Sequence, residues 1–414
     1  MSQLRSNRTF VRLLAGRLVT NAGDSLYVVA TMWLVYDLTN SPLYPGLAGF
    51  LVQAPAAGQF LVGPLVDRWR LRTVLTGTQA LQGVLVLLVP VAAWTGHLSV
   101  WVVLVVIPIL SAVNQFVYPA QSRALPHIVS EGQLVRANSL FSLAYGGTNV
   151  AFHATGGLVV AVIGAVAVYA VDAATFGVSA FLFAGISADV PRSNERDTQH
   201  GPSTEQYLTD LRAGIAYVRG STVRDILLGK MTSNFGFAVL IAVLPGFAAS
   251  FDGVQSFGLL LAAVAGGGLV GAVSASLFET YPFGPVMVAS YLASGLVAAG
   301  ALLADGFTAS LVLFGAAFVP MGVVNVLLTA MLQSSVDDAM LGRITSLQAS
   351  AVGVTMPVGS LLGGATASVV GTRSTLWLVV GVVGSAGAYF YSRQRLRSIP
   401  AVSETDERDL GLHR

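Results

Sequence analysis

The sequence predicts an all-α membrane protein in which twelve transmembrane helices form two pseudo-symmetric six-helix bundles. Three observations predict this fold: an apolar composition, twelve long apolar stretches, and a repeat that relates the two halves of the chain. Of the 414 residues, 54% are hydrophobic and only 10% are charged, and the mean hydropathy is +0.72. A water-soluble domain carries about 25% charged residues, so this composition excludes a water-soluble enzyme.

The apolar stretches are long enough to cross a membrane as helices, which takes about 20 residues each. Backbone groups in hydrocarbon need hydrogen-bond partners inside the protein, and a helix supplies them within one segment. A membrane β-barrel would show alternating segments of about ten residues, which this sequence lacks. The stretches cover approximately residues 10–36, 43–66, 73–95, 99–121, 137–162, 165–187, 226–250, 254–278, 284–304, 308–332, 343–370 and 373–392.

The basic residues indicate the orientation of these stretches. Nearly all of the 22 Lys and Arg residues lie before the first stretch, after the last one, or in connections that follow even-numbered stretches. Arg373 is the one basic residue in the opposite kind of connection. By the positive-inside rule, we expect a multi-pass protein of the cytoplasmic membrane with both termini in the cytoplasm. The net charge of +2 does not indicate nucleic acid binding, and the absence of Cys excludes disulfides and thiolate metal sites.

The charge pattern also predicts the domain boundaries. We expect an N-terminal six-helix bundle over 1–187, a cytoplasmic linker over 188–225, a C-terminal six-helix bundle over 226–396 and a polar cytoplasmic tail over 397–414. Within the linker, residues 203–206 (Ser-Thr-Glu-Gln) have the pattern of a capping box. Apolar residues follow at helical spacing, which predicts a short amphipathic helix on the inner membrane face. A flexible linker is the alternative.

Segments 136–164 and 343–371 align without gaps at an offset of half the chain length. Arg136 and Arg343 open the two segments, and acidic residues precede both. Two similar halves in parallel, with a site between them near the middle of the membrane, form a known transporter architecture. The identical pairs include Ser139/Ser346, Leu140/Leu347, Gly146/Gly353, Thr148/Thr355, Gly156/Gly363, Gly157/Gly364 and Gly164/Gly371.

A short motif stands between the second and third stretches, where residues 63–75 read Gly-Pro-Leu-Val-Asp-Arg-Trp-Arg-Leu-Arg-Thr-Val-Leu. Gly63 allows close approach of helices. Asp67 can interact with a helix N-terminus, while Arg68 and Arg72 can hold its carboxylate and bind anionic headgroups. This loop resembles the signature of the major facilitator superfamily, and the resemblance implies that Arg343 lies near Asp67 and that the loop governs the conformational cycle.

Further segments resemble the branch of this superfamily that contains macrolide-efflux proteins and enterobactin exporters. They are residues 23–24 with 33–39, 119–126, 136–140 and 325–328. The resemblance implies the major facilitator fold and proton-coupled export of a drug-like or siderophore-like amphipathic compound by alternating access. We also expect a monomer that contacts membrane lipids and needs no cofactor. Two features depart from the family pattern: Phe152-His153 replaces an antiporter-type Gly-Pro, and the loop 279–283 lacks basic residues.

Polar residues within the first stretch lie on one helical face, because Asn21, Asp24 and Thr31 follow Arg17 at offsets of 4, 7 and 14. The family resemblance implies that this helix lines a central cavity. Charges at membrane depth cost a few kcal/mol each on insertion scales, and loss of water favours the neutral form of a carboxylate. Asp24 is therefore the first candidate for a proton carrier. A structural ion pair with Arg17 or Lys230 is the equally weighted alternative.

Other polar residues within the stretches are further candidates. Asp172 and His153 are candidates for proton coupling. The alternative for Asp172 is a carboxylate at the membrane interface or one bonded to a neighbouring hydroxyl, and the alternative for His153 is hydrogen-bonded packing. For aromatic candidates, helix packing or lipid contact is the alternative. Candidate cavity and substrate residues are Arg17, Asn21, Tyr27, Asn114, Gln115, Tyr118, Asn149, Lys230, Asn234, Phe237 and Asn325.

Three functions compete on these data. No Walker-type phosphate loop occurs, so an ion gradient, most simply of protons, is the expected energy source of a transporter. A lipid or lysolipid translocator of the same fold is an alternative. A membrane-embedded enzyme would need a nucleophile–base pair or clustered metal ligands, and the five His residues are scattered outside any such motif. We therefore expect a transporter rather than an enzyme.

Overall fold

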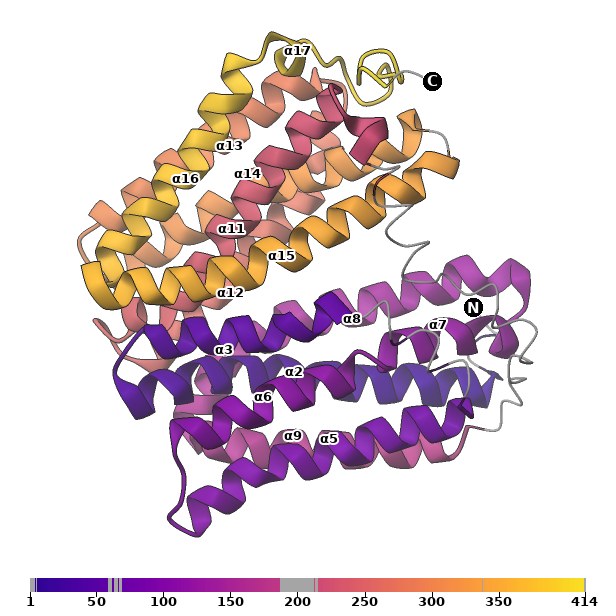
Figure 1. Ribbon diagram of the computed structural model, residues 1–414, viewed down its shortest axis with the longest axis vertical. Helices are drawn as coiled ribbons and strands as arrows, with labels where there is room; N and C mark the ends of the chain where they lie inside the picture. Colours follow the sequence, from indigo (N-terminus) through magenta and orange to yellow (C-terminus); the bar gives the residue numbers. More distant parts are fainter. Residues whose placement is uncertain are drawn as a thin grey trace. The chain divides into compact units, whose positions relative to one another are not determined.

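The computed structural model describes residues 6–58, 69–186, 215–336 and 338–412, together with Leu4, Val62, Val66 and Arg212. The chain divides into unit 1, formed by Met1–Asn40 and Leu51–Thr204, and unit 2, formed by Ser41–Phe50 and Glu205–Arg414. Each unit is a bundle of helices, and the described residues contain no strand (Figure 1). The second boundary lies within the predicted linker, whereas residues 41–50 belong to unit 2. Most of the predicted amphipathic helix lies outside the described residues.

Unit 1 is built around the long helix α2, Arg8–Thr39. The Asn7 side chain caps its start by accepting hydrogen bonds from the backbone N–H groups of Thr9 and Phe10, both at 3.1 Å. Asn40 ends it in the left-handed conformation, with φ of 48°. The other helices are α5 (Leu71–Trp94), α6 (Val100–Asn114), α7 (Val117–Ile128), α8 (Glu131–Ile163) and α9 (Ala165–Ala184). Helix α3 (Leu43–Gln53) and the 3-10 turn η1 (Ala54–Gly58) follow α2 in the chain.

Unit 2 repeats this plan with α11 as its first long helix. Ser221 caps α11, because its hydroxyl accepts a hydrogen bond from the backbone N–H of Arg224 at 3.2 Å. The helices of unit 2 are α11 (Thr222–Ala248), α12 (Val254–Ser274), α13 (Phe283–Leu303), α14 (Phe307–Ser335), α15 (Asp338–Val370), α16 (Thr372–Ser392) and α17 (Gln394–Arg397), with the 3-10 turn η3 (Ala275–Phe278) after α12.

The structure confirms that the two units are related by an internal repeat. Helices α8 and α15 both contain 33 residues and occupy the positions that the sequence alignment pairs. Each is followed by a glycine of nearly the same conformation, Gly164 with φ of 84° and Gly371 with φ of 87°, a region that favours glycine. The packing between helices repeats too. In unit 1, α2 packs against α8 and α9, and α5 packs against α9. In unit 2, α11 packs against α15 and α16, and α13 packs against α16.

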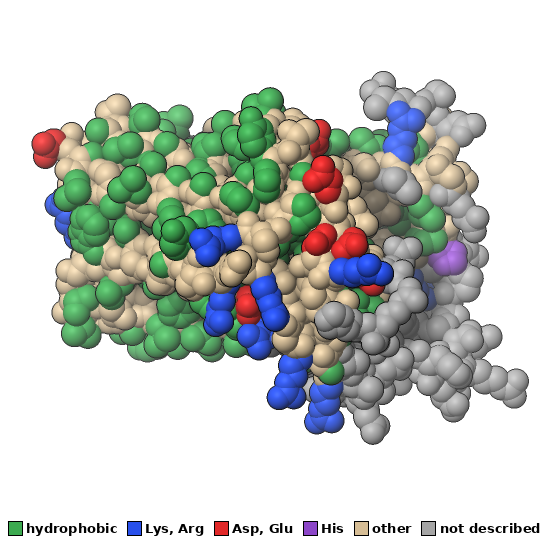
Figure 2. All heavy atoms as spheres, turned by 90° about the horizontal axis from the view of Figure 1, so that it is seen from above, with side chains coloured by type: hydrophobic (Ala, Val, Ile, Leu, Met, Phe, Trp, Pro, Cys, Tyr) green, Lys and Arg blue, Asp and Glu red, His purple; other side chains and the backbone are tan. Residues whose placement is uncertain are grey.

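The surface of the helices is that of a multi-pass membrane protein. Ten helices among the described residues are long and apolar enough to cross a membrane, which is consistent with the twelve predicted spans. Large apolar side chains are exposed along them, including Trp94 (91%), Phe181 (80%) and Val369 (83%). On a soluble protein such a surface would aggregate. Figure 2 shows hydrophobic side chains over much of the visible face, with charged side chains gathered in one part of it.

Glycines let α12 and α14 approach each other closely within unit 2. A Cβ atom on Gly267 would lie 1.9 Å from the backbone oxygen of Gly315, and one on Gly271 would lie 2.0 Å from that of Val319. In the reverse direction, a Cβ on Gly322 would lie 2.1 Å from the backbone oxygen of Gly268. Helices in lipid have no hydrophobic driving force to associate, so their interfaces rely on the close van der Waals packing that small residues allow. Backbone contact therefore holds this helix pair together.

The C-terminal segment packs against unit 2, a feature that the prediction of a polar tail over 397–414 did not include. Leu396, Ile399 and Leu410 are at most 1% exposed. Two backbone oxygens of the segment accept hydrogen bonds from the first N–H groups of helices. The oxygen of Pro400 accepts from the N–H of Phe283 at 2.9 Å, and the oxygen of Leu410 accepts from the N–H of Thr222 at 2.9 Å. These N–H groups have no partner within their own helices. The segment therefore caps α13 and α11.

The tail ends in a tight turn at its exposed acidic residues. The Asp406 carboxylate accepts hydrogen bonds from the backbone N–H groups of Arg408 at 2.8 Å and Asp409 at 3.0 Å. These hydrogen bonds, chiefly the one from Asp409, lower the pKa of Asp406. The turn brings Leu410 back toward the first residues of α11.

We expect Gly271→Ala to destabilise the protein, because its Cβ would overlap the backbone of α14. Overpacking of this kind costs about 1–3 kcal/mol. Gly266→Ala is the matched control on the same helix, since a Cβ there would meet no atom within 4 Å, and alanine is the better helix former. Thermal unfolding of the purified protein in detergent measures both variants. Equal unfolding temperatures for the two would contradict the close contact of α12 and α14.

Candidate functional site

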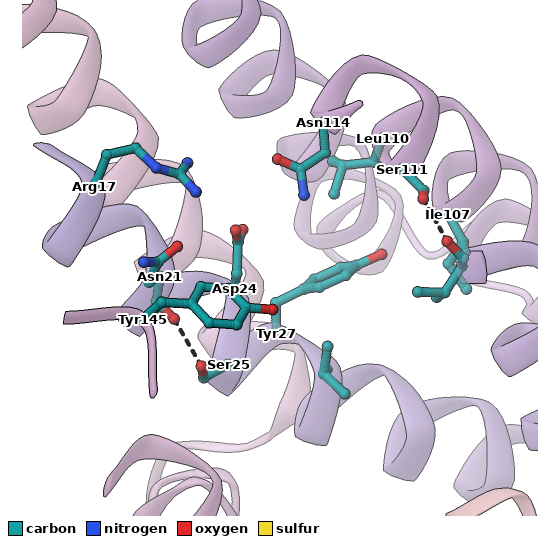
Figure 3. A pocket seen from close by; sticks show the side chains of 12 residues that line it. Arg17, Asn21, Asp24, Ser25, Tyr27, Ile107, Leu110, Ser111, Asn114 and Tyr145 are labelled. Carbon is teal, nitrogen blue, oxygen red and sulfur yellow. Dashed lines mark hydrogen bonds between the residues drawn. The ribbon is translucent and has the colours of Figure 1, made fainter. Parts of the chain in front are cut away.

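Unit 1 contains a cavity of about 240 Å³ lined by residues of α2, α3, α6 and α8. The predicted polar face of the first helix forms one wall, with Arg17, Asn21 and Asp24 in successive turns (Figure 3). Tyr27 and Asn114, which the sequence also indicated, line the same cavity. Three of the four polar residues predicted on this face thus line the cavity, whereas Thr31 does not. The complete lining is Arg17, Asn21, Asp24, Ser25, Tyr27, Val28, Val52, Ile107, Leu110, Ser111, Asn114 and Tyr145.

Two opposite charges face this cavity without a direct contact. In Figure 3, the Arg17 guanidinium, the Asp24 carboxylate and the Asn114 amide extend toward a common space. No hydrogen bond, and no ion pair within 4.0 Å, joins Arg17 to Asp24 in the described part of the chain. The Nη1 atom of Arg17 is buried without a hydrogen-bond partner there. Arg17 and Asp24 thus face one cavity without forming the ion pair that was the alternative to a proton-carrying role.

Asp172 lies next to this wall but is fully buried between α9 and α2. The Thr175 hydroxyl shares its one proton between the Asp172 backbone oxygen at 2.8 Å and the carboxyl Oδ1 at 3.2 Å. Oδ2 has no hydrogen-bond partner in the described structure. Gly23 leaves room for the carboxyl group, since a Cβ there would lie 2.3 Å from Oδ1. Asp172 is not among the cavity-lining residues. The two candidate carboxyl groups thus occupy different environments.

Buried polar contacts fix α2 against α9 beside the cavity. The hydroxyls of Thr31 and Tyr169 lie 2.8 Å apart and share a hydrogen bond. The Ser179 hydroxyl donates to the backbone oxygen of Gly16 at 2.9 Å. Tyr27 packs edge-to-face on Tyr169, with ring centroids 5.2 Å apart. Thr31 thus joins two helices, whereas Arg17, Asn21 and Asp24 line the cavity.

Unit 2 contains a second cavity, of about 420 Å³, between α11, α12, α13, α14 and α16. Four predicted residues meet there: Lys230, Asn234 and Phe237 from α11, and Asn325 from α14. The Nζ atom of Lys230 donates to Oδ1 of Asn325 at 3.3 Å. Phe237 packs edge-to-face on Phe318 of α14, with ring centroids 5.9 Å apart. The cavity therefore has a polar part and an aromatic part.

The remaining predicted residues lie elsewhere or are not described. Gln115 hydrogen-bonds the backbone oxygen of Ser111 at 3.2 Å, and the side chain of Tyr118 is 64% exposed. Neither lines the unit 1 cavity. Arg72 is exposed at the start of α5. Outside the described structure lie residues Gly63, Asp67 and Arg68 and the side chains of Asn149, His153 and Arg343.

Several cavity residues were missed by the sequence analysis. Ser111 lies three residues before Asn114 on the same helical face, a spacing that would have indicated it. Phe318 lies seven residues before Asn325 on α14, which is likewise one face. Tyr291 and Ser294 lie three residues apart on α13, but no residue of that helix was among the sequence candidates. No group of three or more His, Asp or Glu residues in the described part of the chain could hold a metal ion.

Residues 2–409 match the family described as transmembrane secretion effector. The chain belongs to this family. The match confirms the resemblance to the major facilitator superfamily that the loop motif indicated. As a transmembrane secretion effector, the protein is a multi-pass membrane transporter by family.

Relatives and solved structures agree with this family. The chain is 24% identical over 404 residues to multidrug efflux pump Tap of Mycobacterium tuberculosis, covering 95% of each chain. It is 24% identical over 375 residues to macrolide efflux protein A of Streptococcus pyogenes, covering 88% of this chain and 90% of the relative. The structure of the nucleoside transporter NupG superposes with a TM-score of 0.69 at 12% identity, covering 93% of this chain and 98% of that one. This last likeness concerns the fold alone.

We expect Thr175→Val to lower the stability of this secretion effector, because it removes the hydroxyl that contacts the buried Asp172 carboxyl group. An unsatisfied buried polar group costs about 1–3 kcal/mol. Thr175→Ser keeps the hydroxyl and should remain near the wild-type unfolding temperature. Thermal unfolding in detergent measures both variants. A Thr175→Val protein as stable as the Thr175→Ser protein would show that this hydroxyl does not hold Asp172.

Proposed function

We propose that this protein is a secondary active transporter that exports a small amphipathic compound across the cytoplasmic membrane, driven by protons through alternating access. Both termini are cytoplasmic in this proposal, and the protein acts as a monomer. The observation that carries the export direction is the similarity, over 88% or more of the chain, to two relatives named as efflux proteins. The apolar and aromatic lining of the unit 2 cavity supports an amphipathic cargo.

Asp24 is the residue proposed to carry the coupling proton. It is partly buried, faces the unit 1 cavity and has no hydrogen bond or ion pair with a described residue. A carboxylate in such a site can exchange a proton with water in the cavity. Asp172 is buried away from that cavity, so proton access requires a further opening. Geometry therefore favours Asp24 over Asp172 as the proton carrier.

The export proposal is tested by measuring accumulation of dyes, macrolides and siderophores in cells with and without the protein. Lower steady-state accumulation of at least one compound, reversed when the proton gradient is collapsed, supports proton-driven export. Unchanged accumulation across the whole panel would count against it.

We expect Asp24→Asn to abolish export driven by a pH gradient while still permitting downhill equilibration of substrate. The amide has nearly the shape of the carboxyl group but cannot bind and release a proton, so the link between protonation and conformation is lost. The measurement uses purified protein in liposomes with an imposed pH gradient, and a substrate identified in the cell assay. Asp172→Asn is the matched variant and should still concentrate substrate. Concentrative transport by Asp24→Asn would instead make Asp24 a structural residue.

The loop before α5 is proposed to control the rate of the transport cycle. Arg123, on α7, donates through Nη1 to the backbone oxygens of Val66 at 2.8 Å and Trp69 at 3.3 Å. Trp69 also stacks on Phe116, with ring centroids 6.0 Å apart. These contacts hold both sides of the segment that contains Asp67. In this proposal, the Asp67 carboxylate interacts with a helix end in one conformation of the cycle.

We expect Asp67→Asn to slow transport while leaving the equilibrium affinity for substrate within a few-fold of wild type. The substitution removes a charge that would stabilise one conformation, but it does not alter either cavity. Transport rate in liposomes and substrate binding to detergent-purified protein measure the two effects separately. Weaker binding with an unchanged transport rate would contradict this role.

A further inference from the structure

The unit 2 cavity carries a charge of only one sign. Lys230 is the only Lys, Arg, Asp or Glu residue among the described residues that line it, and it is also the only lysine in the sequence. The nearest acidic residue along α11 is Asp225, which already pairs with Arg224 at 2.9 Å. A cation in an apolar site without a counter-ion is costly. An anion bound beside Lys230 would supply the opposite charge.

Lys230 is placed to bind more than one group. It is partly buried at the side of the cavity, and its contact with Oδ1 of Asn325 uses one of three ammonium donors. This contact orients the ammonium group and adds an amide beside it. A carboxylate has two acceptor oxygens that match such a pair of donors.

The cavity is polar at one end and aromatic at the other. Phe237 follows Lys230 by seven residues on α11, and Asn325 follows Phe318 by seven residues on α14. Seven residues make two helical turns, about 10 Å along the axis. The Lys230–Asn325 contact and the Phe237–Phe318 contact therefore define two levels of the same cavity. A ligand that fits has an acidic head and an apolar body at least that long.

We propose that the unit 2 cavity binds an amphipathic carboxylate, with its carboxylate at Lys230 and Asn325 and its apolar body against Phe237 and Phe318. This assignment rests on the proposed function, because it names the class of compound that the transporter carries. Binding to the purified protein tests it without any transport step.

The test uses dansylaminoundecanoic acid and its methyl ester, which share one apolar body and differ in charge. Fluorescence titration of the purified full-length protein in an uncharged detergent gives both affinities. Wild type should bind the acid at least about tenfold more tightly than the ester, the factor that corresponds to about 1.4 kcal/mol. Lys230→Met should remove this preference by weakening acid binding alone, and Lys230→Arg should keep it. Arg224→Met, outside the cavity, is the matched control for general charge attraction and should also keep it.

A second measurement follows Lys230 directly. Reductive methylation with ¹³C-formaldehyde labels Lys230 and the amino terminus, since no other lysine is present. The Lys230 methyl resonance should shift on addition of the acid and not of the ester. Three results would each overturn the proposal. They are equal affinity of wild type for acid and ester, equal weakening of both affinities by Lys230→Met, and a Lys230 methyl resonance that does not shift when the acid is added. The cell accumulation assay tests the transport function separately. If the cells show no export but the purified protein still binds the acid selectively, only the transport function is refuted.

Discussion

Hydrocarbon offers no hydrogen-bond partner, so every polar group within the membrane must find its partner inside the protein. The helices satisfy their own backbones, and this constraint determines where the side-chain hydroxyls lie. Ser179 bonds the backbone of Gly16, and Thr31 bonds Tyr169, so both contacts join α2 to α9. In unit 2, the Ser310 hydroxyl bonds the backbone oxygen of Ala301 at 2.8 Å. These three hydroxyls thus hold helices together, and the buried Nη1 atom of Arg17, which has no hydrogen-bond partner among the described residues, lines the unit 1 cavity.

The same constraint explains the role of glycine. Without a hydrophobic force between helices in lipid, close packing must hold them together, and α12 and α14 meet backbone to backbone at Gly267 and Gly271. Gly164 and Gly371 have a different role, because they turn the chain between α8 and α9 and between α15 and α16 with a positive φ. These two glycines occupy the same position in the repeat. The halves of the sequence therefore preserve the conformation of the turn as well as the length of the helix before it.

The sequence predicted what helical geometry alone determines. The spans follow from apolar length, and Arg17, Asn21 and Asp24 share a wall because their spacing places them on one face. What depends on packing between helices could not be predicted. Lys230 and Asn325 are far apart in sequence, and their contact exists only because α11 and α14 line one cavity. The buried C-terminal segment was missed for a similar reason: Ile399 and Leu410 are buried by packing against helices that are distant in sequence, which no local pattern reveals.

The two cavities differ in which of their charges can change. In unit 1, Arg17 keeps its charge under all conditions that a protein experiences, so only Asp24 can alter the net charge of the cavity between neutral and positive. In unit 2, no described acidic residue lines the cavity, so Lys230 has no carboxylate counter-ion among the described lining residues. A proton carrier requires a titrating group near a fixed opposite charge, as Asp24 is near Arg17. An anion site requires a cation without a carboxylate neighbour, as Lys230 is. The distribution of Arg17, Asp24 and Lys230 meets these two requirements in separate units.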